Sequence, residues 1–203
     1  MTIDEIMRTS PVIPVLVLEG EADWAKLAET FVGAGLRVIE VTLRTPEALG
    51  AIRAMAKVPG AIVGAGTVLN DRHLGDAVDA GSQFIVTPGL TEPLAKAVLR
   101  SGTAYLPGVS TAGDIMRGMD LGLDRFKFFP AEASGGIAAL KALSGPFGAA
   151  RFCPTGGIGP DTAADWLAVP AVLCVGGTWF YRGPEDSFDA VAERARTAAA
   201  LRT

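Results

Sequence analysis

The feature that most restricts the fold of this chain is an alternation of strand-like and helix-like segments that repeats along most of its 203 residues. Short apolar runs rich in β-branched residues predict strands, and each run is followed by Gly, Pro or Thr and then by helical periodicity. The predicted strands cover residues 11–18, 37–43, 61–67, 83–87, 104–107, 125–129, 151–155 and 171–175. Capping side chains or prolines mark helix starts at residues 45–47, 70–71, 91–93 and 159–161.

These strand–helix units predict a single α/β domain over residues 1–203 that folds as a (β/α)8 barrel, the TIM-barrel fold. No linker or low-complexity segment divides the chain. An open, doubly wound parallel sheet is the alternative. In a barrel, active-site groups come from the C-terminal ends of the strands and the loops after them, so the residues that close each strand are the first candidates for a functional site.

The composition argues against several classes of protein. Hydrophobic residues make up 49% of the chain, yet Gly, Pro or charged residues interrupt the apolar runs well before they could span a bilayer. A net charge of −4 is not the excess of positive charge that is typical of proteins that bind nucleic acid. The first residues, Met1 to Glu5, lack the basic start of a secretory signal. We therefore expect a cytoplasmic protein that binds neither membrane nor nucleic acid.

The residues with metal-binding or redox chemistry are few. His73 is the only histidine, which leaves none for a catalytic triad or a multi-histidine metal site. Cys153 and Cys174 lie in apolar, strand-like segments without the spacing of metal ligands. This pattern predicts two reduced, buried thiols and no metal site.

Lys127 lies in a setting that is unusual for a lysine. It falls within the aromatic run Arg-Phe-Lys-Phe-Phe-Pro of residues 125–130, which predicts a buried strand that ends at a proline. Burial disfavours the ammonium form, and a neutral amine attacks a carbonyl carbon to form a Schiff base. The alternative is a lysine that pairs with an acid or reaches solvent from the strand end. The other lysines fall in helical patterns that keep the ammonium in water: Lys26, Lys57, Lys96 and Lys141.

The predicted second strand ends in polar residues that a packed strand does not need. Period-two alternation directs Ile39, Val41 and Leu43 toward the helix layer. Glu40 and Arg44 then point into the barrel mouth, where they are candidate functional residues; the alternative is a structural ion pair between them. The same alternation applied to residues 61–67 groups three small or short side chains at the end of strand three, which would leave room for a ligand: Val63, Ala65 and Thr67.

Two pairs of glycines follow the last two predicted strands. Gly156 and Gly157 come after the strand over 151–155, and Gly176 and Gly177 precede Thr178 after the strand over 171–175. Glycine lets backbone N–H groups approach an anion at a helix N-terminus, and barrels commonly bind phosphate after strands seven and eight. Turns also need glycine, so a single pair would say little. Two pairs in these places predict a phosphate site.

Several segments resemble the KDPG (2-keto-3-deoxy-6-phosphogluconate) aldolases, which also act as 4-hydroxy-2-oxoglutarate aldolases. The two signature-like segments are GLRVIEVTLR at residues 35–44 and GLDRFKFFPA at residues 122–131. The similarity continues through residues 64–67, 87–93, 107–111 and 154–158, and so covers nearly the whole chain from the first predicted strand to Trp179.

This resemblance implies a role for each candidate residue. Lys127 would form the Schiff base, Glu40 would act as general acid and base, and Arg44 with Thr67 would hold the oxygens of the pyruvyl end. The implied pocket and phosphate contacts are Pro88, Phe129 and Thr155, and Gly156, Gly157, Gly176, Gly177 and Thr178. Two departures are visible. The first strand lacks an arginine that some relatives have there, which gives Arg44 more weight, and Thr178 stands where many relatives have serine and keeps the hydroxyl.

The function that the resemblance implies is a class I aldolase of the Entner–Doudoroff pathway, without metal or other cofactor. It would cleave 2-dehydro-3-deoxy-6-phosphogluconate to pyruvate and glyceraldehyde 3-phosphate, and it would be a homotrimer. The alternatives within this chemistry are the galactonate epimer and 4-hydroxy-2-oxoglutarate as substrates. Two other classes stay open: a phosphosugar isomerase or epimerase with Glu40 as base, and a non-catalytic phosphosugar-binding module.

Overall fold

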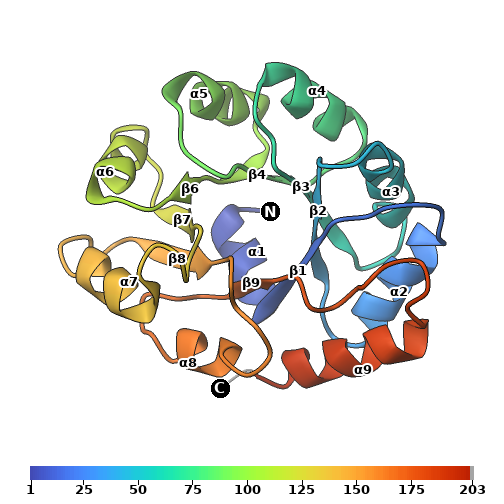
Figure 1. Ribbon diagram of the computed structural model, residues 1–203. Helices are drawn as coiled ribbons and strands as arrows, with labels where there is room; N and C mark the ends of the chain where they lie inside the picture. The colour runs from blue at the N-terminus through green and yellow to red at the C-terminus, as the bar shows by residue number, and fades with distance from the viewer. Residues whose placement is uncertain (202–203) are drawn as a thin grey trace.

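The strands of the protein form a ring around a central axis, with helices outside it (Figure 1). The computed structural model describes residues 1–201. The strands are β1 (Val12–Leu16), β2 (Val38–Thr42), β3 (Ile62–Gly66), β4 (Phe84–Val86), β5 (Ala104–Leu106), β6 (Gly108–Val109), β7 (Arg125–Phe128), β8 (Arg151–Pro154) and β9 (Val175–Gly177). The strand pairings that are resolved are all parallel.

The strand order closes the sheet into a barrel. Hydrogen bonding links the strands in the order β5-β4-β3-β2-β1-β9 and, separately, β6-β7-β8. β5 and β6 are two parts of one barrel strand interrupted at Pro107, which has no backbone N–H to donate. Bridges between Phe152 and Val172 and between Thr155 and Gly176 join β8 to the last strand. The predicted (β/α)8 barrel is thereby confirmed, and the open doubly wound sheet is excluded.

The helices lie outside the strands, except for α1 at the N-terminus. Their bounds are α1 (Ile3–Thr9), α2 (Trp24–Gly33), α3 (Ala48–Met55), α4 (Asp71–Asp79), α5 (Glu92–Ser101), α6 (Ala112–Asp120), α7 (Gly136–Ser144), α8 (Ala163–Leu167) and α9 (Phe188–Ala199). The predicted starts of α4 and α5 are confirmed, with Asn70 and Thr91 as N-caps. The predicted starts near residues 45 and 159 come too early, because these residues form turns before α3 and α8.

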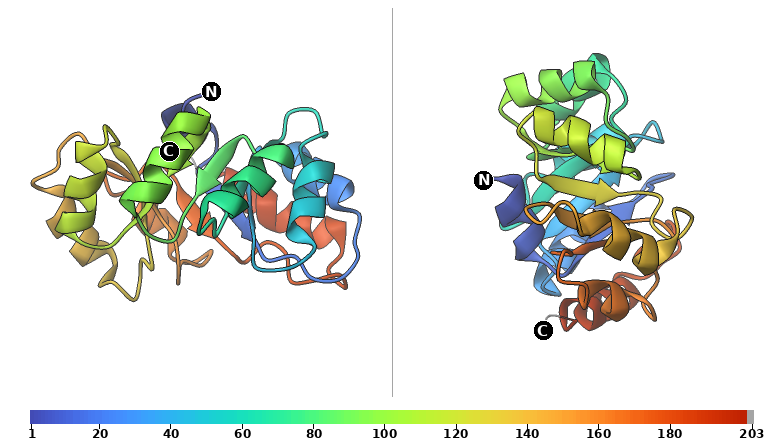
Figure 2. Two further views of the ribbon diagram at one scale, coloured as in Figure 1. Left: turned by 90° about the horizontal axis from the view of Figure 1, so that it is seen from above. Right: turned by 90° about the vertical axis from the view of Figure 1, so that its left-hand side faces the viewer.

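Helix α1, which the sequence patterns did not predict, closes the N-terminal end of the barrel. The right-hand view of Figure 2 places it at one end of the ring of strands. Thr2 and Glu5 form a capping box that starts the helix. Ile6 and Met7 are fully buried among the inward-facing residues of the strands, including Val38 on β2. The half of the barrel interior next to α1, at the N-terminal ends of the strands, is thus a packed apolar core. We call the other half, toward the C-terminal ends of the strands, the upper half; it holds the buried polar residues Glu40 and Lys127.

The alternation of side chains along the strands separates two layers. On β2, Ile39 and Val41 belong to the core between barrel and helices, as predicted, and Val38 belongs to the core inside the barrel. On β3, Val63 and Ala65 were predicted to face the barrel interior, and this prediction was wrong. Both residues pack in the core between barrel and helices. Two glycines instead face the interior of the barrel at that strand. A Cβ added at Gly64 would meet the ring of Phe84, and a Cβ added at Gly66 would meet the side chain of Glu40.

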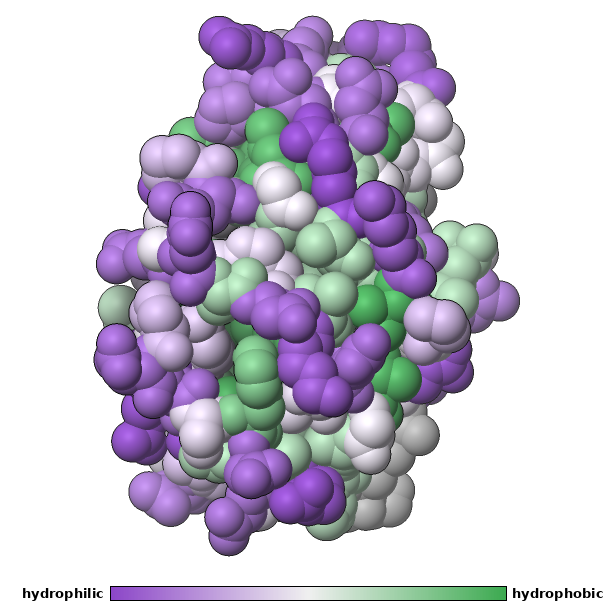
Figure 3. Space-filling view, turned by 90° about the vertical axis from the view of Figure 1, so that its right-hand side faces the viewer, coloured by the Kyte–Doolittle hydropathy of each residue, from purple (hydrophilic) through white to green (hydrophobic). Residues whose placement is uncertain are grey.

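One face of the molecule, seen in Figure 3, carries mainly hydrophilic side chains. Figure 3 shows, on the face that carries α2 and α3, small groups of hydrophobic residues between hydrophilic ones. Within residues 1–201, none of the helices is both long and apolar enough to cross a membrane.

Candidate active site

Lys127 and Glu40 meet inside the upper half of the barrel. Lys127 comes from β7 and Glu40 from β2, 87 residues apart in the chain. The Lys127 Nζ donates to the Glu40 carboxylate, at 3.0 Å from Oε1 and 3.4 Å from Oε2. The two residues are only 6% and 3% exposed. A buried ion pair is a poor way to gain stability, because removing both charges from water costs as much as their attraction returns. Such a pair is therefore a candidate for chemistry.

This contact decides between the alternatives that the sequence left open. Lys127 does pair with an acid, and that acid is the other predicted catalytic residue. Glu40 directs its carboxylate to Lys127 and not to Arg44. The other four lysines are exposed, as their helical patterns predicted. One amine of this chain is therefore held in a buried site beside a carboxylate.

The aromatic run around Lys127 divides between the two faces of β7. Phe126 and Phe128 point outward into the helix-side core, against Phe152 and Trp166 respectively. Phe129 alone is near the amine, with its ring centroid 5.3 Å from the Lys127 Nζ. A ring at this distance attracts a cation weakly and excludes water from one side of the amine.

Arg44 and Thr67 lie together at the mouth, after the ends of β2 and β3. The Arg44 Nε is 3.4 Å from the Thr67 hydroxyl oxygen, and Arg44 is exposed to solvent. Thr67 has a φ of 57°, in the left-handed region. This conformation is strained for a β-branched residue, and strain of this kind clusters at functional sites. The sequence did not predict this conformation, because β-branched residues such as threonine rarely adopt a positive φ.

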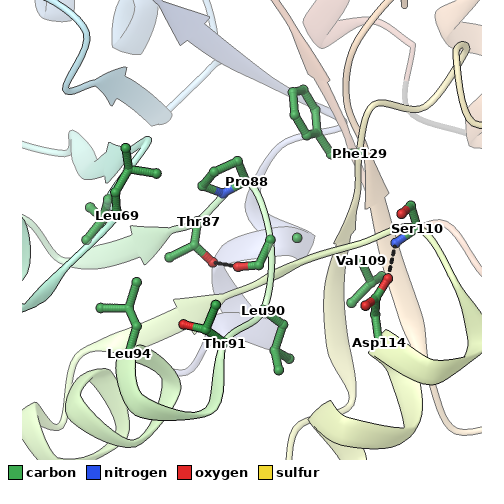
Figure 4. Close-up of a pocket in the computed structure, with 13 residues that line it drawn as sticks. Leu69, Thr87, Pro88, Leu90, Thr91, Leu94, Val109, Ser110, Asp114 and Phe129 are labelled. Atoms are coloured by element: carbon green, nitrogen blue, oxygen red, sulfur yellow. Dashed lines mark hydrogen bonds between the residues drawn. The ribbon is translucent and has the colours of Figure 1, made fainter.

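Pro88 and Phe129 line a pocket of about 390 Å³ (Figure 4). Lys127 and Glu40 are not among its lining residues, and Phe129 is the wall residue whose ring lies near the Lys127 amine. The pocket lies between the loop that follows β4 and the start of α6. The Thr87 hydroxyl holds that loop, since it contacts the Gly89 carbonyl oxygen at 2.7 Å and the Tyr105 hydroxyl at 3.0 Å. Burial raises the pKa of Tyr105 above its ordinary value, against the opposing effect of its hydrogen bond with Thr87. Sequence reasoning missed Thr87 and Tyr105.

Thr155 lies inside the barrel just after β8. It is 4% exposed, and its hydroxyl is 3.4 Å from the Cys153 carbonyl oxygen. A side chain at Gly176 would place its Cβ 2.3 Å from this hydroxyl oxygen. Gly176 therefore leaves the space that Thr155 occupies. Cys153 itself is a buried free thiol, as is Cys174, in agreement with the sequence expectation.

Gly156 and Gly157 form a turn with two consecutive left-handed residues, at φ values of 103° and 82°. Backbone hydrogen bonds tie this turn to the end of β7, from the Ala131 amide to the Thr155 carbonyl and from the Glu132 amide to the Gly156 carbonyl. Within residues 1–201 the amides of Gly156 and Gly157 donate to no protein acceptor. Free, adjacent amides in such a turn suit an anion.

The second glycine pair lies elsewhere than expected. Gly176 and Gly177 are part of β9, whereas the sequence placed them after a strand over 171–175. The Trp179 ring fills the side-chain space of Gly177, with a ring carbon 1.9 Å from the position of a Cβ. Thr178, next in the chain, is exposed at the mouth. Helices α8 and α9 begin only at Ala163 and Phe188, so neither glycine pair directly precedes a helix N-terminus.

A closed parallel barrel that holds a buried amine against a buried carboxylate among its strand ends has the parts of a class I aldolase. The family model described as "Aldolase: KDPG and KHG aldolase" matches residues 3–193 of the chain. This chain therefore belongs to the KDPG and KHG aldolase family. The family resemblance and the lyase class predicted from the sequence are both confirmed.

Similar proteins are known from several bacteria. The KHG/KDPG aldolase of Escherichia coli (strain K12) is 52% identical over 188 residues, which cover 92% of this chain and 87% of that protein. A crystal structure of 2-keto-3-deoxy-6-phospho-gluconate aldolase from Zymomonas mobilis ATCC 29191 matches with a TM-score of 0.97 at 51% identity, covering 100% of this chain and 98% of that chain.

A structure from a third bacterium bears on the chemistry. The KDPG aldolase of Legionella pneumophila matches with a TM-score of 0.92 at 38% identity, and the match covers 98% of each chain. That structure holds pyruvate captured at low pH as a covalent carbinolamine intermediate. A carbinolamine is the species that precedes a Schiff base, so that relative carries an adduct of the kind that the setting of Lys127 predicts for this chain.

Proposed function

We propose that this protein is a class I aldolase that cleaves 2-dehydro-3-deoxy-6-phosphogluconate to pyruvate and glyceraldehyde 3-phosphate, in the Entner–Doudoroff pathway. The observation that carries the proposal is the buried contact between the Lys127 amine and the Glu40 carboxylate at 3.0 Å. An isomerase or a binding module would need no amine at that position. Membership of the KDPG and KHG aldolase family supports the same choice.

In the proposed reaction Lys127 attacks the C2 ketone of the substrate. Its ammonium must first lose a proton, and the adjacent Glu40 carboxylate is placed to accept it. The protonated Glu40 returns this proton to the carbinolamine hydroxyl, which leaves as water and gives an iminium ion, and Glu40 is a carboxylate again. The iminium draws electrons from the C3–C4 bond. That bond breaks once the C4 hydroxyl gives up its proton, and the aldehyde leaves. Both electrons of the broken bond remain on the lysine-bound part as an enamine.

Glu40 would serve as both base and acid in these steps. As a carboxylate it takes the proton of the C4 hydroxyl, directly or through a water molecule. The resulting carboxylic acid protonates C3 of the enamine and so returns to the carboxylate form. Hydrolysis of the second iminium releases pyruvate and the free amine. The cycle needs no metal or other cofactor for charge balance, because the iminium supplies the electron sink.

The substrate would extend across the barrel mouth. At the pyruvyl end, Arg44 and Thr67 would hold carboxylate or carbonyl oxygens, and Pro88, Phe129 and the buried Thr155 would be further contacts. At the other end, the free amides of Gly156 and Gly157 and the exposed hydroxyl of Thr178 would bind the phosphate. Gly176 and Gly177 would contribute by leaving room for Thr155 and Trp179.

Replacing Thr178 by valine is expected to weaken the binding of phosphorylated substrate. The two side chains have the same shape, and a hydrogen bond to a charged group is worth about 1.5–3 kcal/mol, so KM should rise by roughly 10- to 100-fold. KM for unphosphorylated 4-hydroxy-2-oxoglutarate serves as the control and should change less than about threefold. An equal rise for both substrates would contradict a phosphate contact. Gly157 and Gly177 are poorer test sites, because any side chain there would meet Glu132 or Trp179.

The phosphate site also predicts an order of substrates. We expect kcat/KM to be highest for 2-dehydro-3-deoxy-6-phosphogluconate and at least about tenfold lower for 4-hydroxy-2-oxoglutarate, which lacks the phosphate. The galactonate epimer differs only at C4, where Glu40 acts, and should be cleaved at an intermediate rate. Pyruvate release from each compound under matched conditions measures this order. No pyruvate from any of the three would refute an aldolase function.

The setting of the enzyme is part of the proposal. We infer a single-domain cytoplasmic protein that acts as a homotrimer and binds neither nucleic acid nor membrane. The net charge of −4 supports the absence of a nucleic-acid partner. Exposed apolar side chains on α6 offer surface for subunit contact: Met116 and Met119.

A further inference from the structure

Gly66, the last residue of β3, leaves the space in which the Glu40 carboxylate lies. A Cβ at residue 66 would be 2.1 Å from the Glu40 Oε1 and 2.8 Å from its Cδ and Cγ. The backbone does not explain the glycine, because Gly66 is not among the residues with positive φ. An L-residue fits this backbone, so the reason for glycine lies in the space beside it.

The register of the strands shows how Glu40 comes to occupy that space. Glu40 lies opposite Gly64 on β3, and Thr42 lies opposite Gly66. The Glu40 side chain therefore leans toward the next residue pair, in the direction of the barrel mouth. From there its carboxylate contacts Lys127 on β7, which Figure 1 shows across the ring from β2 and β3.

A side chain at residue 66 would force this carboxylate to move. A carbon and an oxygen that are not bonded cannot approach each other to 2.1 Å. The backbone of β2, which carries Glu40, is held by its pairing with β1 and β3, so the side chain has to move. Glu40 would have to rotate away from β3, and its contact with the Lys127 amine would lengthen. Displacing a catalytic group by about 1 Å can lower a rate by about 10²-fold.

We propose that Gly66 is a positioning residue that sets the location of the Glu40 carboxylate between Lys127 and the substrate. The proposal rests on the proposed role of Glu40 in proton transfer. It assigns a reaction-specific purpose to a residue that has no functional group of its own. Gly64, two residues earlier on the same face, has a different neighbour, because a Cβ there would meet the ring of Phe84 at 2.5 Å.

The test compares Gly66→Ala with the matched variant Gly64→Ala. In Gly66→Ala we expect kcat to fall by about 10- to 10³-fold with a KM change below about threefold. The final yield of pyruvate trapped by borohydride should stay near one per chain, because Lys127 remains in place. Gly64→Ala should lower the melting temperature while kcat per trapped lysine stays within about fivefold of the parent. A similar kcat loss in both variants, or a kcat within twofold of the parent in Gly66→Ala, would overturn the proposal.

A double variant identifies the group through which Gly66 acts. When Gly66→Ala is added to Glu40→Gln, the further loss of kcat should be below about threefold, since the proton transfer is already gone. A further loss as large as in the parent background would show that Gly66 acts independently of Glu40. Should Glu40→Gln itself retain the parent kcat, the proposed role of Glu40 would fail first, and that outcome is separate from the one above.

A second route covers the case in which Gly66→Ala does not fold. Glu40→Asp shortens the acid by one carbon and so draws the carboxylate oxygens back from the position of Oε1, the atom that a Cβ at residue 66 would approach to 2.1 Å. The double variant Gly66→Ala with Glu40→Asp should then recover folded protein, as measured by circular dichroism and thermal unfolding. Continued failure to fold, when Glu40→Asp alone folds, would mean that the collision lies elsewhere and would refute the proposal.

Discussion

Replacing Lys127 by arginine is expected to abolish turnover, with a fall in kcat of roughly 10⁴-fold or more, the range seen when a covalent nucleophile is lost. A guanidinium stays protonated and cannot attack a ketone. The arginine still carries a positive charge toward Glu40, so the carboxylate is not left without a counter-charge in the barrel. The measurement is kcat with 2-dehydro-3-deoxy-6-phosphogluconate, together with thermal unfolding of the same sample.

The chain offers a matched control for this substitution. Lys96 also pairs with a glutamate, Glu92, at 2.6 Å, but both side chains lie on the surface of α5 and are more than half exposed. Lys96→Arg should therefore leave kcat within about twofold of the parent. Activity of Lys127→Arg within tenfold of the parent, in a sample free of wild-type protein, would rule out a Schiff base at this residue.

Glu40→Gln is expected to lower kcat by about 10²- to 10⁴-fold, the usual contribution of general acid–base catalysis. The amide keeps the size of the carboxylate, and its oxygen still accepts a hydrogen bond from Lys127, but it neither takes up nor releases a proton at neutral pH. The final yield of the pyruvate adduct should change little. kcat and the melting temperature are measured on one purified sample, with the exposed Glu92→Gln as the control.

A purely structural role for Glu40 predicts a different pattern. Losing one charge of a buried pair leaves the other uncompensated, which costs about 3–5 kcal/mol. In that case the melting temperature would drop sharply while kcat per folded molecule stayed near normal. Because Glu40 contacts Lys127 and not Arg44, this structural alternative now concerns the Lys127 amine.

The parts of the fold that follow from periodicity were predictable. Alternation along β2 fixed the directions of Ile39 and Val41, and hence that of Glu40, because the strand is regular from end to end. Lys127 stood out because its neighbours are apolar. That the two residues touch was not predictable, because strand patterns give directions and not distances across a barrel.

The errors have specific physical causes. The inward face of β3 was inferred by extending the alternation of side chains as far as Thr67. The strand ends at Gly66, and the φ of 57° at Thr67 breaks the alternation there. The last strand was placed too early because glycines disfavour strands, whereas pairing with β1 extends β9 over Gly176 and Gly177. Helix α1 was missed because a short helix gains its stability from contacts with the barrel, which its own sequence does not display.

The most direct test of the account is to treat the protein with sodium borohydride in the presence of pyruvate and to map the adduct by peptide mass spectrometry. Borohydride reduces an iminium to a stable secondary amine, so the covalent bond is fixed on the residue that formed it. We predict irreversible inactivation and one pyruvate-derived adduct per chain, on the peptide that contains Lys127. An adduct on one of the four exposed lysines, or full activity without any adduct, would contradict the assignment of Lys127 as the Schiff-base residue.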